Sequence, residues 1–271
     1  MLAGNQGARI VAGGTDLVVA SRSGKAPLPE RLIAIHRLKE LAGIHAEAKG
    51  GLRIGALTTH ADLEISKLVR DSWSALSDAS ALVGSPATRH MGTVGGNVCN
   101  ASPAMELGSP LLVFDATIEL ASAGGLRSVP FSSFVTAPGI TSALPGELLI
   151  AVTLPPLPGR CGSGYVRLEY RLAMEIAIVG AAAVVRLDDG DRCIEARVAL
   201  TAVAPTCVRA TETEEILRGK ALDSDLLKRA AGAAAASARP IDDVRASADY
   251  RRAMVPVMVE RALTMALERA K

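Results

Sequence analysis

The sequence predicts an α+β fold, with an α/β-like N-terminal part followed by a smaller domain of sheet and helices. Strand-like and helix-like segments alternate through the first half of the chain. The stretch from Pro155 to Gly164 is rich in proline and glycine, as linkers are. After it, two apolar runs precede three helix-like segments. We therefore predict two domains, at residues 1–158 and 164–271.

Short apolar runs and the residues beside them predict the elements of the first domain. Runs rich in Ile, Val and Leu predict buried strands at residues 9–12, 32–35 and 52–56. Thr59 can cap a helix running to Leu68, with Asp62 favourably placed in its first turn. A second helix is expected at residues 72–82, and a further apolar stretch covers residues 111–120.

The second domain is expected to begin with a β-hairpin. Apolar runs at residues 176–187 and 194–203 have the length of buried strands. Asp189 and Gly190 lie between these runs and are suited to a tight turn. The two strands should therefore pair antiparallel.

Three helices should follow this hairpin and cover its sheet. Thr211 and Glu214 have the spacing of a capping box, which favours a helix ending near Gly219. The other two helices are expected at residues 224–238 and 249–269. Pro256 falls inside the last of them, so it should kink that helix or mark the junction of two shorter ones.

Composition favours a protein with a large apolar core and excludes several classes of partner. Hydrophobic residues make up 49% of the 271 residues and aromatic residues only 3%, so Ala, Val, Leu and Ile must build that core. The net charge of +2 gives no reason to expect nucleic acid or an anionic membrane surface as a partner. Residues 1–6 do not resemble a signal peptide, and no apolar run could span a bilayer.

The cysteines give no sign of a metal site. Cys99, Cys161, Cys193 and Cys207 lie far apart and form no Cys-x-x-Cys pair, so neither zinc nor an iron–sulfur cluster is expected. Reduced thiols in the cytoplasm are the simpler interpretation.

Two loops with paired glycines are the strongest candidates for a binding site. One, at residues 12–17, follows a predicted strand, and the other lies at residues 93–97. Glycine lets the backbone approach a ligand closely, and N–H groups of such loops can converge on a phosphate. Neither loop fits the Rossmann or P-loop fingerprint. Two tight turns remain an alternative, so the residues themselves indicate only a phosphate-binding α/β domain.

Along nearly its whole length, the chain resembles the FAD-binding medium subunits of the xanthine dehydrogenase and carbon monoxide dehydrogenase family. Ala12–Leu17 resembles the family motif Ala-Gly-Gly-Thr-Asp-Leu, and Thr93–Glu106 resembles Thr-x-Gly-Gly-Asn followed by Ala-Ser-Pro-x-x-Asp. Residues 167–179 and the C-terminal half are also similar to the family. The resemblance implies a PCMH-type FAD-binding domain in two subdomains and a C-terminal domain of the carbon monoxide dehydrogenase flavoprotein type.

The resemblance implies which residues would hold FAD. The two glycine loops would bind its diphosphate and nearby ribityl, and Glu106 would bind a cofactor hydroxyl. Core packing is the alternative for Val83 and Leu149, and a solvated surface charge is the alternative for Arg167. The cofactor residues implied are Ile10, Val11, Ala12, Gly13, Gly14, Thr15, Asp16, Leu17, Val83, Gly84, Thr93, Val94, Gly95, Gly96, Asn97, Ala101, Ser102, Glu106, Leu149 and Arg167.

The chain departs from the family pattern at three places. Glu106 replaces the usual Asp, and Arg167 replaces the usual Lys, which exchanges a point charge for a planar fork. The family also has a strand and a helix before the first motif, for which Met1 lies too close to Gly13. The resemblance therefore implies a shortened start or a more open adenine side.

The resemblance also implies a function as an electron-transfer subunit. Electrons from a molybdopterin-binding large subunit would pass through a [2Fe–2S] small subunit to FAD, and then to NAD or another acceptor. No catalytic residue is predicted, and His36, His45, His60 and His90 are dispersed, with His90 a weak candidate near the second loop. The alternatives are a stand-alone PCMH-type flavin oxidoreductase with its own substrate pocket, and a non-catalytic scaffold that has lost FAD.

Overall fold

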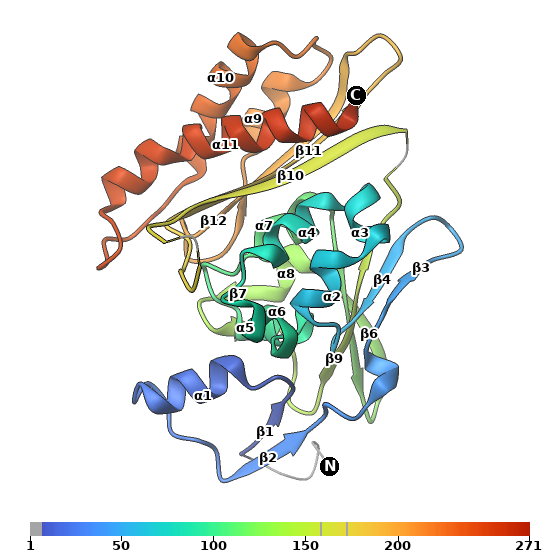
Figure 1. Ribbon diagram of the computed structural model, residues 1–271, viewed down its shortest axis with the longest axis vertical. Coiled ribbons are helices and arrows are strands. Elements are labelled where there is room, and N and C mark those ends of the chain that lie inside the picture. The colour runs from blue at the N-terminus through green and yellow to red at the C-terminus, as the bar shows by residue number, and fades with distance from the viewer. Residues whose placement is uncertain (1–6, 158, 172) are drawn as a thin grey trace.

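Three parts follow one another along the chain (Figure 1). The computed structural model describes residues 7–157, 159–171 and 173–271. The N-terminal six residues, for which no signal peptide was expected, lie outside the described residues, as do Pro158 of the predicted linker and Leu172. Helices and strands mix throughout, which confirms the predicted α+β class.

The first part is a small β–α–β unit. Strands β1 (Ala8–Val11) and β2 (Arg31–Ala34) pair in parallel, and helix α1 (Thr15–Arg22) connects them. Both strands fall where the sequence predicted strands. The first glycine loop joins β1 to α1, so its place is fixed by a strand on one side and a helix on the other.

The second part contains a five-stranded sheet with the order β3-β4-β9-β5-β6, in which all neighbouring strands are antiparallel. Its strands are β3 (Ile44–Ala46), β4 (Leu52–Gly55), β5 (Thr117–Ser122), β6 (Gly125–Pro130) and β9 (Leu148–Leu154). A separate two-stranded ribbon follows β6, with β7 (Val135–Ala137) and β8 (Ile140–Thr141).

Short helices pack beside this sheet and carry the second glycine loop. They are α2 (His60–Ile65), α3 (Lys67–Ser72), α4 (Ser74–Ala81), α5 (Pro86–Met91), α6 (Val94–Asn100), α7 (Gly108–Val113), α8 (Phe131–Phe134) and the 3-10 turn η2 (Lys39–Leu41). The Thr59 cap with Asp62 is confirmed as a capping box. The helix predicted to reach Leu68 instead ends at Ile65, because Ser66 caps a new helix.

The third part is a four-stranded antiparallel sheet, ordered β10-β11-β12-β13, covered by helices (Figure 1). The predicted hairpin is confirmed by the pairing of β11 with β12. The elements are β10 (Arg160–Leu168), β11 (Val179–Leu187), β12 (Cys193–Thr201), β13 (Val208–Arg209), α9 (Thr211–Leu217), α10 (Ser224–Ala233), η3 (Ala234–Ser237) and α11 (Ala248–Ala270).

Two details of these helices differ from the sequence-based expectation. Helix α11 runs unbroken through Pro256, so the expected alternative of a junction between two shorter helices is wrong. Thr211 forms no side-chain cap for α9. Glu214 instead accepts hydrogen bonds from the Arg209 side chain and from the backbone N–H of Val198, because the neighbouring strand offers donors that compete with the helix end.

The C-terminal sheet lies between two apolar layers. On β11, Ala181, Ala183 and Val185 pack with α10 and α11, while Ala182 and Val184 pack into the core of the N-terminal part. Alternate residues of a strand face opposite sides of its sheet, so one strand contributes to both cores. No described helix is long and apolar enough to cross a membrane.

Candidate functional site

The first glycine loop packs directly against the segment that leads into the second. A Cβ added to Gly13 would lie 1.7 Å from the carbonyl oxygen of Met91, so only glycine permits this close approach. Gly14 has a φ of 71° and caps α1 in the left-handed conformation. Within the described residues, the N–H groups of Gly13 and Gly14 have no acceptor. Such donors, together with the first N–H groups of α1, are of the kind that bind anions in proteins.

The second glycine loop differs from the expectation that its N–H groups are free. The N–H of Gly95 donates to the carbonyl of Ala56 at 2.8 Å, and that of Gly96 donates to Thr93 Oγ1 at 3.1 Å. Gly95 is buried, and a Cβ there would lie 2.9 Å from the Ala56 carbonyl oxygen, whereas Gly96 is exposed. Gly95 therefore allows α6 to pack closely against the backbone that follows β4, and Gly96 keeps the outer surface of the loop open.

A third segment holds the two loops together. Thr59 and Thr93 form an isolated antiparallel bridge, and the N–H of His60 donates to the carbonyl of Gly92 at 3.1 Å. A Cβ on Gly92 would lie 3.2 Å from the His60 ring and 3.7 Å from Thr15 Oγ1. The sequence reasoning missed this role of residues 56–60. The only signal for this role in the sequence was the short distance between the end of a predicted strand and the helix cap at Thr59.

His60 is buried beside this junction as a neutral imidazole. The residue is only 2% exposed, and its Nδ1 has no hydrogen-bond partner among the described residues. Burial, aided by the nearby positive charge of Arg89, lowers the pKa of His60 to about 4. The ring therefore adds no charge to the junction at neutral pH.

A second cluster of predicted site residues forms around Arg167, on β10. Its Nη1 donates to Glu106 Oε1 at 2.6 Å, to the Leu82 carbonyl at 2.9 Å and to the Glu175 carbonyl at 3.3 Å. Nη2 forms an ion pair with Glu169. The Arg167 side chain has no exposed surface, so the alternative of a solvated surface charge is wrong.

Glu106 is also largely buried, with its side chain 10% exposed. Burial raises the pKa of Glu106, and the guanidinium of Arg167 acts against that rise by favouring the charged form. A carboxylate in this position is held in one orientation by its partner. Any further ligand of Glu106 would meet a fixed oxygen rather than a freely rotating side chain.

The other predicted residues lie on elements that border these two clusters. Val83 and Gly84 follow α4 and come directly after Leu82, whose carbonyl binds Arg167. Ala101 ends α6 with a φ of 50°, and its carbonyl accepts from the N–H of Gly139. Leu149 is 5% exposed within the apolar core, as its alternative interpretation expected.

Val94 and Asn97 lie on α6, and Ser102 follows that helix, where its Oγ accepts from the N–H of Ala104 at 3.2 Å. The other predicted residues fall at the first loop and at its flanks. Ile10 and Val11 are half-buried on β1, and Asp16 is exposed in the first turn of α1. Sequence reasoning missed Leu82, Glu169 and Glu175, the other partners of Arg167. Leu82 and Glu175 bind it through backbone carbonyls, and such roles leave no mark on residue type.

Two family models cover most of the chain. Residues 1–157 match the family described as the FAD binding domain in molybdopterin dehydrogenase, and residues 165–266 match the CO dehydrogenase flavoprotein C-terminal domain. Both matches agree with the resemblance stated from the glycine motifs.

Related proteins match nearly the whole chain in sequence. The chain is 36% identical to the 6-hydroxypseudooxynicotine dehydrogenase complex subunit alpha of Paenarthrobacter nicotinovorans, over 99% of this chain and 90% of that protein. It is 34% identical to the carbon monoxide dehydrogenase medium chain of Afipia carboxidovorans, over 97% of this chain and 90% of that protein.

Solved structures of related enzymes have the same fold over nearly the whole chain. Carbon monoxide dehydrogenase from Hydrogenophaga pseudoflava superimposes with a TM-score of 0.92 at 34% identity, covering 98% of this chain and 91% of the solved chain. Quinoline 2-oxidoreductase from Pseudomonas putida 86 gives a TM-score of 0.92 at 29% identity, covering 99% and 92%. The chain belongs to the family of FAD-binding medium subunits of xanthine and carbon monoxide dehydrogenases, and its cofactor is FAD.

Proposed function

We propose that this chain is the electron-transfer subunit of a molybdenum hydroxylase complex. When bound, FAD would supply the redox chemistry by which electrons from [2Fe–2S] clusters on a small partner subunit reach NAD or another acceptor. A molybdopterin-binding large subunit oxidises the organic substrate. The observation that supports this best is the packing of Gly13 against Met91, which joins the two glycine loops into one cradle.

The residues present fit a dinucleotide diphosphate. The N–H groups of Gly13 and Gly14 are available as donors, and the open side of Gly96 leaves room for close approach. Asn97 Oδ1 is a buried acceptor with no partner among the described residues, and a hydroxyl of a bound ligand would satisfy it. We therefore assign the predicted cofactor residues of both loops to the diphosphate and ribityl.

FAD supplies the redox chemistry, and this chain's residues bind and orient it. Gly13, Gly14 and the first turn of α1 hold the diphosphate by backbone donors. The His60 ring is neutral, so it adds no charge to that of the nearby Arg89. Glu106, fixed by Arg167, offers an acceptor to a cofactor hydroxyl.

The test is purification of the complex from its native host, followed by cofactor analysis and identification of the chains. We expect FAD, molybdopterin and [2Fe–2S] clusters in one assembly. A yellow monomer that oxidises a substrate unaided would instead establish the stand-alone flavin oxidoreductase. Cytoplasmic location is part of the proposal, supported by four free cysteines, and cell fractionation checks it.

A further inference from the structure

Arg167 joins three segments that surround the proposed cofactor site. Leu82 directly precedes Val83 and Gly84, and Glu106 ends the second glycine motif, so two of the three contacts of Nη1 fix proposed cofactor residues or their neighbours. The third contact, to the Glu175 carbonyl, holds the connection between β10 and β11. Arg167 itself comes from the C-terminal sheet. One side chain therefore sets the relative position of segments from both domains.

The burial of Arg167 leaves it no surface for a ligand. Its side chain is 0% exposed, with Nη1 bound to Glu106, Leu82 and Glu175 and Nη2 paired with Glu169, while Nε has no hydrogen-bond partner among the described residues. We propose that Arg167 is a positioning residue for FAD, which holds the backbone beside Val83 and the carboxylate of Glu106 in place without touching the cofactor. This inference rests on the proposed function, because it assumes that Val83, Gly84 and Glu106 contact FAD.

In this chain, the acceptors around position 167 match a guanidinium better than the lysine that is usual in the family. A planar fork with five donors can bind two carboxylates and two carbonyls at once, whereas a lysine ammonium has three donors around one point. A lysine ammonium would therefore leave at least one of these carboxylates or carbonyls without a donor. A neutral side chain would leave Glu106 and Glu169 as buried carboxylates with no compensating charge, which is strongly unfavourable.

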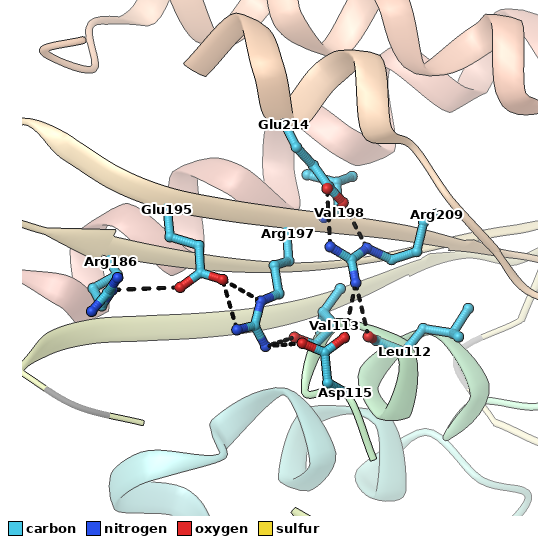
Figure 2. A network of polar contacts seen from close by, with 9 residues as sticks. All are labelled: Leu112, Val113, Asp115, Arg186, Glu195, Arg197, Val198, Arg209 and Glu214. Carbon is cyan, nitrogen blue, oxygen red and sulfur yellow. Dashed lines mark hydrogen bonds and ion pairs between the residues drawn. The ribbon is translucent and has the colours of Figure 1, made fainter. Parts of the chain in front are cut away.

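A second arginine network offers a matched control. Figure 2 shows Asp115, from the N-terminal part, between Arg197 and Arg209 of the C-terminal sheet, with Arg197 Nη1 at 2.7 Å and Arg209 Nη1 at 3.1 Å. This network also joins the two domains, but it includes none of the proposed cofactor residues. Arg197→Lys therefore weakens an inter-domain contact of the same kind away from the proposed site.

The experiment compares FAD binding with stability in the full-length chain. Wild type, Arg167→Lys, Arg167→Met and Arg197→Lys are titrated with FAD by flavin fluorescence, and the visible circular dichroism of bound flavin is recorded. The melting temperature of each FAD-free chain is measured in parallel. We expect both Arg167 variants to bind FAD at least tenfold more weakly and to change the flavin dichroism. Arg197→Lys should stay within twofold of wild type.

Other outcomes overturn the inference in distinguishable ways. If Arg167→Lys binds like wild type while Arg167→Met does not, a positive charge alone is needed, and the positioning role is wrong. If Arg167→Lys and Arg197→Lys lose FAD affinity equally, Arg167 serves only to join the domains. If wild type itself binds no FAD, both the proposed function and this inference fail.

Discussion

Individual glycines in the second loop have different physical roles although they are adjacent. Gly95 is buried against the backbone of Ala56, whereas Gly96 faces outward. A Cβ added to Gly96 would have only Thr93 Oγ1 close to it, at 3.0 Å. A substitution at Gly95 must therefore disturb the fold. A substitution at Gly96 tests the proposed ligand contact with much less effect on packing.

We predict that Gly96→Val abolishes FAD retention while the chain stays folded, because the side chain fills the space needed for close approach of the diphosphate. The measurement is the flavin-to-protein ratio after gel filtration, together with the far-UV spectrum. Gly232→Val is the control, since Gly232 is also an exposed helical glycine with open space around it. A Gly96→Val protein with full flavin would refute the role of this loop.

The buried neutral His60 predicts a definite acid sensitivity. Its pKa falls from a usual value of 6.5 to about 4, so between these pH values the unfolded chain binds a proton that the folded chain does not. Stability is thus fully present above pH 6.5 and decreases as the pH falls towards 4. At about 1.4 kcal/mol for each pKa unit, the loss reaches roughly 3 kcal/mol.

His60→Gln removes this titration, so the variant should lose roughly 3 kcal/mol less between about pH 7 and about pH 4 than wild type. Urea unfolding at several pH values measures the difference. The test compares the slope of the unfolding free energy against pH, because only this slope depends on proton binding by His60. The absolute stability of the variant at neutral pH does not enter the comparison. Parallel slopes for the two proteins would show that His60 does not titrate as described.

At the scale of elements, the edge strand β10 shows how the structure protects unpaired backbone. The carbonyl of Ser163 accepts from Ser74 Oγ at 2.8 Å, and Asp78 accepts from the N–H of Tyr165 at 3.2 Å. A Cβ on Gly162 would lie 2.2 Å from the backbone of α11. Gly162 and Gly164, which the sequence analysis placed in a linker, therefore lie inside a strand, where they let α11 pack closely. Covering an edge in this way prevents pairing with another chain.

Helix α11 tolerates Pro256 in its interior, although proline lacks the N–H that a helix needs. We predict that Pro256→Ala stabilises the chain by about 1–3 kcal/mol, because it restores a backbone donor and removes the clash of the ring. Denaturant unfolding measures the gain. Glu260→Ala, one turn further along the same helix, should change stability by less than about 0.5 kcal/mol. An unchanged or lower stability for Pro256→Ala would contradict this account.

The whole molecule is held together by an apolar core that both domains share. Tyr165, Ala182, Val184 and Ala199 of the C-terminal sheet belong to the same buried cluster as the core of the N-terminal part. Polar contacts between the domains, among them those around Asp78, Asp115 and Glu106, add to this cluster. Separating the domains would therefore expose one apolar face of the C-terminal sheet to water.

We predict that the full-length chain unfolds in one cooperative transition, because separating the domains would expose the shared core. Differential scanning calorimetry of the FAD-free protein measures this, by comparing the calorimetric and van't Hoff enthalpies. Ala182→Asp would place a charge in the shared core and should lower the transition for both domains together. Two separate peaks in wild type would mean that the domains are independent.

The sequence alone was sufficient for strands β1, β2 and β4, the C-terminal hairpin with its helices, the two glycine loops and the family, but not for most elements between α4 and β10. Each of these features depends on residues that are contiguous in the sequence. Examples are the paired glycines after β1, the cap at Thr59 and the hairpin around Gly190. Local pattern reports local structure because backbone conformation and hydrophobic periodicity depend on near neighbours.

Only the tertiary structure decided what the individual site residues contact. Glu106 and Arg167 lie 61 residues apart, and nothing near either of them in the sequence marks the other as its partner. In the same way, the need for glycine at position 13 comes from the Met91 carbonyl, which approaches from a distant helix. Such contacts depend on how separate elements pack, and close packing of distant segments leaves no periodic signal along the chain.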